Sequence, residues 1–237
     1  MLVDLSMFGG HGDSILQKQK TSQRRQSTIS SQSSSSPTAR SLPFARFTYE
    51  HRARSIDSDN IINWEPDSEA RELIKLTWSD NFNFLFDLGG KIFDYIFTHV
   101  PECKSLFPSI HKYGEAYRES REFRSQTLKF AQTISHCVQN IYRIDDVAAY
   151  LAKIGEQHCR FAERGFTPDL WDVFLDAMEV ALIDQISTVA PDLDVQRQEA
   201  AAHVWRRLTF FIITHMKHGY FLGLEKPLHN HRKHTTD

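Results

Sequence analysis

The sequence predicts an all-α domain behind a long polar extension, and three observations support this fold class. From Trp64 onward, apolar residues recur at spacings of three and four, as they do along one face of a helix. No stretch alternates with period two for long enough to indicate a strand. Apolar residues form 41% of the 237, including 17 Phe, which is enough for one core of ordinary size.

Residues 1–62 lack helical periodicity, and we predict that they form a disordered extension. They contain 13 Ser and cannot bury enough apolar surface to offset the entropy of ordering the chain. Residues 15–54 carry eight Lys or Arg against one acid. Ser27 and Ser55 lie next to arginines, as in the substrates of basophilic kinases, although such motifs also arise by chance in a Ser/Arg-rich tail.

Charge and cysteine usage exclude several classes of protein. The formal net charge is only −2, and no run approaches the roughly 18 apolar residues that a membrane-spanning helix needs. The three cysteines have no CxxC spacing, and the first residues do not form a signal peptide, so we expect free thiols and a cytoplasmic location. We therefore expect neither a nucleic-acid partner nor integral membrane association.

The helices can be placed in order along the chain from periodicity and from their start and stop residues. The first opens at Pro66 to Ser68 and is expected to bury Leu73, Leu76 and Trp78. The others follow in this order: a helix over 82–99, a corner over 101–109, a polar linker over 111–120, helices over 122–141 and around 151–161, and helices over 168–189 and 194–219. The domain is taken as residues 63–223, and residues 224–237 as a disordered tail.

Two features interrupt the apolar pattern of these helices. Gly89 and Gly90 lie inside a helix, where glycine costs up to about 1 kcal/mol, so the pair predicts a close approach of another helix backbone. Gln126 lies on the edge of the apolar stripe formed by Phe123, Phe130 and their neighbours. The sequence therefore predicts an amide that faces inward.

His158 is the most informative histidine. It shares one helix face with Leu151, Ile154 and Phe161, at successive spacings of three, four and three, so its imidazole should be buried. A buried imidazole needs a partner, which is usually a backbone carbonyl in the core. The alternative is a metal ligand, and the helix by itself does not decide between the two.

The order and spacing of certain residues resemble those of animal globins. The separations among the first helices and the corner agree without gaps, and His158 then falls at the proximal position and Gln126 at the distal position, 32 residues upstream. The resemblance covers roughly residues 66–222, and the distal Gln, Trp205 and the Ser-rich leader are typical of invertebrate, nematode-type globins. The residues that match over the first helices and the corner are Trp78, Gly89, Phe93, Phe97, Pro101 and Phe107.

The resemblance implies a globin fold of six to eight helices around a pocket for haem b. His158 would be the single protein ligand of the iron, and Phe107 would stack on the porphyrin. Phe93, Phe123 and Phe130 would wall the distal side, although a Phe stripe at helical spacing is more often simply core. Ile154 and Phe166 would flank His158 as apolar neighbours.

Gln126 would determine the chemistry of the distal side. A glutamine amide is a poor iron ligand but can donate an N–H to bound oxygen, which acquires partial negative charge on ferrous iron. The resemblance thus implies a pentacoordinate haem that binds O2, CO and NO. His136 lies ten residues further along the same helix and is expected to be a bystander.

Several functions would share this site. The first is reversible oxygen binding for storage or carriage. The second is an O2 or redox sensor that signals through the extension, and the third is a haem enzyme of electron transfer, NO dioxygenation or nitrite reduction. A globin-shaped domain without haem is a further alternative, because a fold does not determine a function. A homodimer is compatible with the sequence but is not indicated by it.

Overall fold

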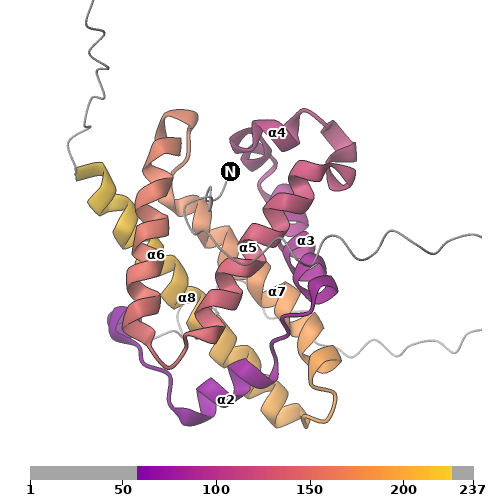
Figure 1. The fold of residues 1–237 in the computed structure, drawn as a ribbon, viewed down its shortest axis with the longest axis vertical. Coiled ribbons are helices and arrows are strands. Elements are labelled where there is room, and N and C mark those ends of the chain that lie inside the picture. Colours follow the sequence, from indigo (N-terminus) through magenta and orange to yellow (C-terminus); the bar gives the residue numbers. More distant parts are fainter. Residues whose placement is uncertain (1–57, 226–237) are drawn as a thin grey trace, which may run out of the picture. The chain divides into compact units, whose positions relative to one another are not determined.

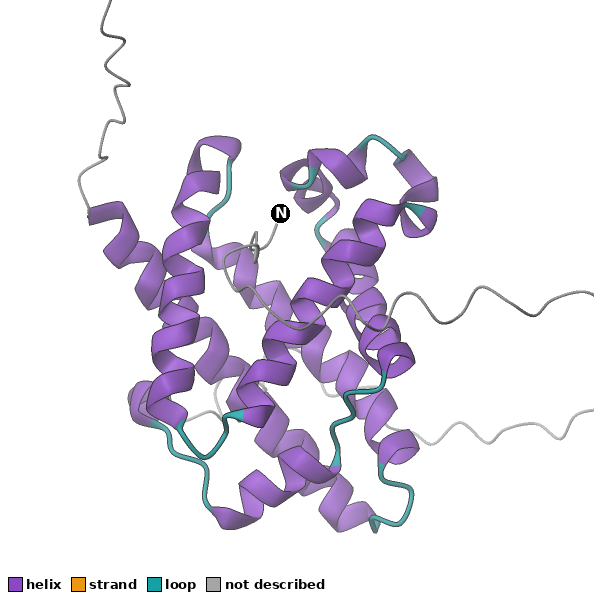
Figure 2. Ribbon diagram, in the orientation of Figure 1, coloured by secondary structure: helices purple, strands orange, loops and turns teal. Residues whose placement is uncertain are grey.

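The computed structural model describes residues 58–225, and within this range the chain is helical without strands (Figure 2). The predicted all-α class is confirmed for this part of the chain. Ser27, Ser55 and most of the expected N-terminal extension and C-terminal tail lie outside the described residues. None of the described helices is long and apolar enough to cross a membrane.

Between residues 58 and 225, six longer α-helices form the framework, and shorter helical elements precede or connect them. The elements are η1 (Ser58–Asn63), α2 (Ser68–Leu76), α3 (Phe82–His99), η2 (Pro101–Leu106), α4 (Pro108–His111), η3 (Gly114–Glu119), α5 (Arg121–Gln139), α6 (Ile144–His158), η4 (Cys159–Arg164), η5 (Pro168–Trp171), α7 (Asp172–Val189) and α8 (Val195–Glu225).

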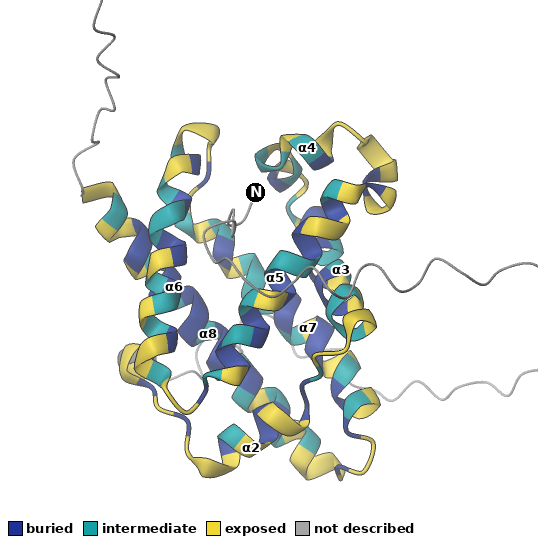
Figure 3. Cartoon of the chain, viewed as in Figure 1, coloured by how far each residue is buried: buried dark blue, intermediate teal, exposed yellow. Residues whose placement is uncertain are grey.

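The helices form one connected framework (Figure 1). The last helix, α8, runs beside α6 and also contacts α2 and α7. On its other side α7 packs against α3, which in turn packs against α5. Buried residues lie along the inward faces of these helices, as the amphipathic pattern requires (Figure 3).

Side-chain caps define where three of the long helices begin. The Oδ1 of Asp67 accepts a hydrogen bond from the backbone N–H of Ala70 at 2.8 Å, at the start of α2. Asn81 caps α3 and Ser120 caps α5 in the same way. Each cap satisfies a backbone donor that has no partner within its helix, so the boundaries follow from local chemistry.

Two expectations for the ends of the first and last helices were wrong. Leu76, expected to be buried, is 49% exposed, because α2 ends there and Trp78 reaches the core from beyond the helix. The last helix does not end at Gly219 but continues to Glu225. Gly219 is a packing position and not a stop signal, since a Cβ on it would lie 1.9 Å from the carbonyl oxygen of Ala152 on α6.

The polar linker expected over 111–120 is not irregular. Its second half forms the 3-10 helix η3, and Tyr117 within it is buried. The burial of Tyr117 holds this segment against the core. The otherwise hydrophilic composition of the segment gave no sign of that burial.

The expected close approach at the glycine pair is confirmed for Gly89 and wrong for Gly90. A Cβ on Gly89 would lie 2.6 Å from the backbone oxygen of Thr127, so α3 and α5 cross with their backbones nearly in contact. A Cβ on Gly90 would have no atom within 4 Å. Gly89 alone is therefore required by the crossing.

We expect Gly155→Ala to destabilise the protein by at least about 2 kcal/mol, because overpacking between rigid backbones cannot relax cheaply. A Cβ there would lie 1.9 Å from the backbone oxygen of Met216, where α6 crosses α8. Gly90→Ala is the matched control and should stabilise by up to about 1 kcal/mol through helix propensity. Urea denaturation measures both changes, and equal stabilities of the two variants would contradict the expectation.

Candidate functional site

A largely apolar cavity lies where α3, the corner after it, the end of α6 and the start of α7 meet. It holds about 570 Å³ of space between atoms, including some open to solvent. The imidazole of His158 forms part of the cavity wall. The lining residues are Phe93, Ile96, Cys103, Leu106, Phe107, His158, Phe161, Phe166, Leu170, Trp171 and Phe174.

The imidazole of His158 has one bonded and one unbonded nitrogen. Its side chain is almost fully buried, and Nδ1 lies 2.7 Å from the carbonyl oxygen of Ile154, one turn earlier on α6. A carbonyl can only accept, so Nδ1 carries the hydrogen and Nε2 presents a lone pair. Nε2 is buried without a hydrogen-bond partner among the described residues.

Burial lowers the pKa of His158 from its ordinary value of 6.5 to about 4, and the nearby Arg160 acts in the same direction. The hydrogen bond to the carbonyl of Ile154 opposes this shift but is outweighed. The imidazole is therefore neutral at physiological pH. A neutral imidazole with a fixed tautomer and an unbonded nitrogen has the electronic form that a metal ligand needs.

Three aromatic rings hold the imidazole in one orientation. The ring centroids of Phe161, Phe166 and Trp171 lie 5.7, 5.5 and 5.2 Å from that of His158. Trp171 and Phe166 also contact each other at 5.0 Å. These rings exclude water from His158 and restrict its rotation, so Nε2 keeps its direction.

A second aromatic cluster centres on Phe93 of α3. Its ring contacts those of Phe107, Phe123 and Phe130 at centroid distances of 5.7, 6.2 and 6.1 Å. Phe130 in turn contacts Phe174 at 4.7 Å. The cluster connects α5 to the cavity wall through edge-to-face contacts, which aromatic rings prefer.

The structure brings only some of the residues singled out from the sequence to the cavity. His158, Phe93, Phe107 and Phe166 line it. Phe123 and Phe130 lie one ring behind the wall, in contact with Phe93. Ile154 contributes the carbonyl that orients His158.

Gln126 is buried, as expected, but lines a different hollow at the surface of α5. The same hollow is lined by Arg121, Lys129, Glu122 and the hydroxyl-bearing residues Ser109 and Ser125. This side of α5 therefore combines one buried amide with two cations and one carboxylate.

Sequence reasoning missed Trp171 and gave no special role to Cys103 and Leu106, which also line the cavity. Trp171 follows the turn after η4, and its 13-residue separation from His158 matches no helical period. The one available signal was the density of aromatic residues shortly after His158. Their contact depends on a turn that periodicity does not describe.

His136, expected to be a bystander, lies on α5 with its ring 4.1 Å from that of Tyr150 on α6. Burial lowers its pKa below the ordinary value. It is not among the residues that line the cavity. His136 is thus a suitable control for substitutions of His158.

Comparison with known proteins gives one family and several relatives. The family model described as globin matches residues 90–211. The chain is 25% identical over 133 residues to the globin-related protein glb-13 of Caenorhabditis elegans, a match that covers 56% of this chain and 44% of that protein. It is 28% identical over 127 residues to the extracellular monomeric globin of Tubifex tubifex, covering 52% and 86%. The chain thus spans less than half the length of the nematode protein.

A solved structure shares the fold. It is described as a hexacoordinated heme protein from an anhydrobiotic tardigrade, and the match has a TM-score of 0.53 at 19% identity. It covers 67% of this chain and 97% of that one. A match of this extent concerns the arrangement of most of the described helices and not one local motif.

Proposed function

The chain belongs to the globin family, and from this premise we propose that it binds haem b at the cavity beside His158 and takes up oxygen reversibly. The observation that carries the proposal is the buried Nε2 of His158, which has no hydrogen-bond partner among the described residues. An unsatisfied buried nitrogen is costly, and coordination to iron would remove that cost. The haem would supply the ferrous iron to which oxygen binds.

The chemistry of the wall fits the cofactor. A porphyrin is a flat apolar ring. The cavity is lined by rings from both aromatic clusters and by aliphatic side chains between them. Phe107 at the corner would stack against the ring, and Phe166 and Trp171 would shield the side on which His158 lies. The carbonyl of Ile154 would keep the His158 tautomer correct for ligation.

The hollow on α5 fits the polar parts of the same group. Haem b carries two carboxylates, and Arg121 and Lys129 are cations beside Gln126 in that hollow. Glu122 also lines the hollow, but its carboxylate is paired with Lys112, 3.0 Å away. Gln126 does not line the cavity itself, and in this proposal it would donate its amide N–H to oxygen bound on the α5 side of the haem, because the partial negative charge of bound oxygen favours such a donor. The same hydrogen bond would therefore stabilise bound oxygen more than bound carbon monoxide, which carries less negative charge.

We propose that the iron keeps an open sixth position. The related tardigrade protein is described as hexacoordinated, which here would require a second side chain that can bind iron. Among the residues that line the cavity His158 is the single histidine, and a glutamine amide is a weak ligand. Cys103 is the other donor on the wall, but burial raises the pKa of its thiol to about 11, so the thiolate is scarce.

Absorption spectra of the purified full chain test this function. The ferrous protein is expected to show a pentacoordinate spectrum that shifts on adding O2 or CO and reverts when the gas is removed. A ferrous spectrum with the bands of two axial nitrogen ligands would contradict the open site. A chain that retains no haem would overturn the function.

The same sample separates oxygen storage from the redox alternatives. Slow autoxidation of the oxygenated protein, over hours, is expected for storage or carriage. Oxidation within seconds would instead favour a redox enzyme or sensor, because such a protein must exchange electrons readily.

A further inference from the structure

One buried side chain anchors the segment between the corner and α5. From residue 111 to residue 119, Tyr117 is buried and every other residue is exposed. Apolar burial is the main source of attachment for such a segment. The position of η3 therefore depends chiefly on what Tyr117 contacts.

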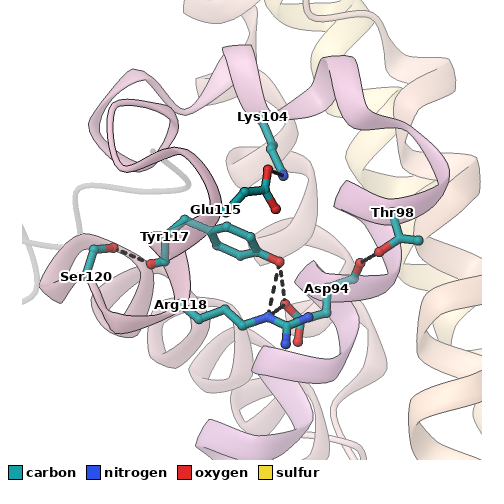
Figure 4. A network of polar contacts seen from close by, with 7 residues as sticks. All are labelled: Asp94, Thr98, Lys104, Glu115, Tyr117, Arg118 and Ser120. Atoms are coloured by element: carbon teal, nitrogen blue, oxygen red, sulfur yellow. Dashed lines mark hydrogen bonds and ion pairs between the residues drawn. The ribbon is translucent and has the colours of Figure 1, made fainter.

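The ring of Tyr117 packs between two helices, and its hydroxyl is bonded to one of them. Its centroid lies 5.5 Å from that of Phe97 on α3 and 5.2 Å from that of Phe123 on α5. The hydroxyl donates to Oδ1 of Asp94 on α3 at 2.7 Å (Figure 4). The Nε of Arg118 donates to the same carboxylate oxygen at 2.8 Å. A phenol bonded to a carboxylate forms a strong, charge-assisted contact.

Tyr117 remains a donor at ordinary pH. Burial raises its pKa above the ordinary value, and the hydroxyl's hydrogen bond to the Asp94 carboxylate raises it further, because an anionic phenolate beside Asp94 is unfavourable. The nearby guanidinium of Arg118 opposes these effects. The contact between Tyr117 and Asp94 therefore persists over the physiological range.

The backbone of Tyr117 is tied to the first turn of α5. The hydroxyl of Ser120 donates to the carbonyl of Tyr117 at 2.6 Å (Figure 4). The same hydroxyl accepts the N–H of Phe123 at 3.1 Å. Gln126 follows Phe123 by three residues, and both are buried on one face of the helix. A displacement of Tyr117 therefore moves the start of α5 and the amide of Gln126 with it.

We propose that Tyr117, held by Asp94, is a positioning residue for the gaseous ligand, because it sets where Gln126 places its amide. The inference rests on the proposed function and assigns Tyr117 no contact with haem or gas. Asp94 and Tyr117 form a latch between α3 and η3 that keeps the start of α5 in a constant position relative to α3.

The test compares Tyr117→Phe and Asp94→Ala with the unsubstituted full chain. Both variants lose the hydroxyl–carboxylate bond, and Tyr117→Phe keeps the ring packing. In the haem-loaded protein we expect the O2 dissociation rate to rise about threefold or more and the CO dissociation rate to stay unchanged. A general loosening of the fold would change both rates alike.

A second readout needs no haem. Amide hydrogen exchange at residues 117–123 should become faster in both variants, while exchange in α6 and α8 stays the same. Tyr113→Phe is the matched control, since Tyr113 lies in the same segment and bonds to Glu122 on the exposed surface. Its rates should equal those of the unsubstituted protein, because an exposed contact contributes little.

The outcomes distinguish the two proposals. If the unsubstituted chain binds no haem, the proposed function falls and the role of Tyr117 toward a gas falls with it. If haem and oxygen bind but the O2 rate is unchanged in Tyr117→Phe, or changes together with the CO rate, only the inference is overturned.

Discussion

His158→Ala is expected to abolish stable haem binding, with the loss of the Soret band after gel filtration of the reconstituted protein. The substitution removes the only imidazole among the residues that line the cavity and leaves the apolar wall as the sole source of affinity. Coordination through one neutral imidazole is the protein's single bond to the iron in this proposal. We expect the fraction of chains that retain haem to fall at least about tenfold, a change of about 1.4 kcal/mol or more in binding free energy.

Two controls separate ligation from packing. His136→Ala removes a half-buried imidazole that contacts Tyr150 and does not line the cavity, so its haem content should equal that of the unsubstituted chain. In His158→Gly, added free imidazole should occupy the vacated space and restore the Soret band. Full haem retention in His158→Ala, or equal loss in His136→Ala, would show that His158 is not the ligand.

Gln126→Leu is expected to raise the O2 dissociation rate by about tenfold or more, since a hydrogen bond to a charged acceptor contributes about 1.5–3 kcal/mol. Leucine fills a similar volume but cannot donate, so haem content should not change. Bound CO carries less negative charge than bound O2, and its dissociation rate should change by less than about twofold. Stopped-flow displacement of each gas measures both rates in one preparation.

Ser125→Ala is the neighbouring control for that result. Ser125 lines the same hollow as Gln126 but is exposed, so removing its hydroxyl should leave both rates as they are. If the O2 dissociation rate of Gln126→Leu equalled that of the unsubstituted protein, Gln126 would not be the hydrogen-bond donor to bound oxygen. A Gln126→Leu protein with altered haem content would instead assign Gln126 to cofactor retention.

Local chemistry in the sequence was sufficient for the helices and for one crossing. Asp67 caps α2 as its place after Pro66 suggests, α3 runs from Phe82 to His99 as expected, and the cost of an internal glycine pointed to the crossing at Gly89. The globin fold, which the resemblance to animal globins implied, is confirmed by the family match and the shared fold. The helix positions and caps depend on neighbours within a few residues, which one-dimensional periodicity records.

Which residues meet at the cavity was decided only by tertiary structure. The burial of His158 could be read from its helix face, whereas the ring of Trp171 reaches it through a turn with no period. Gly155 appeared as an ordinary helix residue and Gly219 as the end of the last helix, until the packing of α6 on α8 showed that each lies against the backbone of the other helix.

The sequence by itself determined the order of the long helices, most of the faces they bury and which histidine to examine. The tertiary structure decided the aromatic enclosure of His158, the separate position of Gln126 and the bond from Tyr117 to Asp94, 23 residues apart. The physical reason is the range of the interactions. Helix periodicity and caps act over one or two turns, while the enclosure and the latch form only when distant segments are packed together.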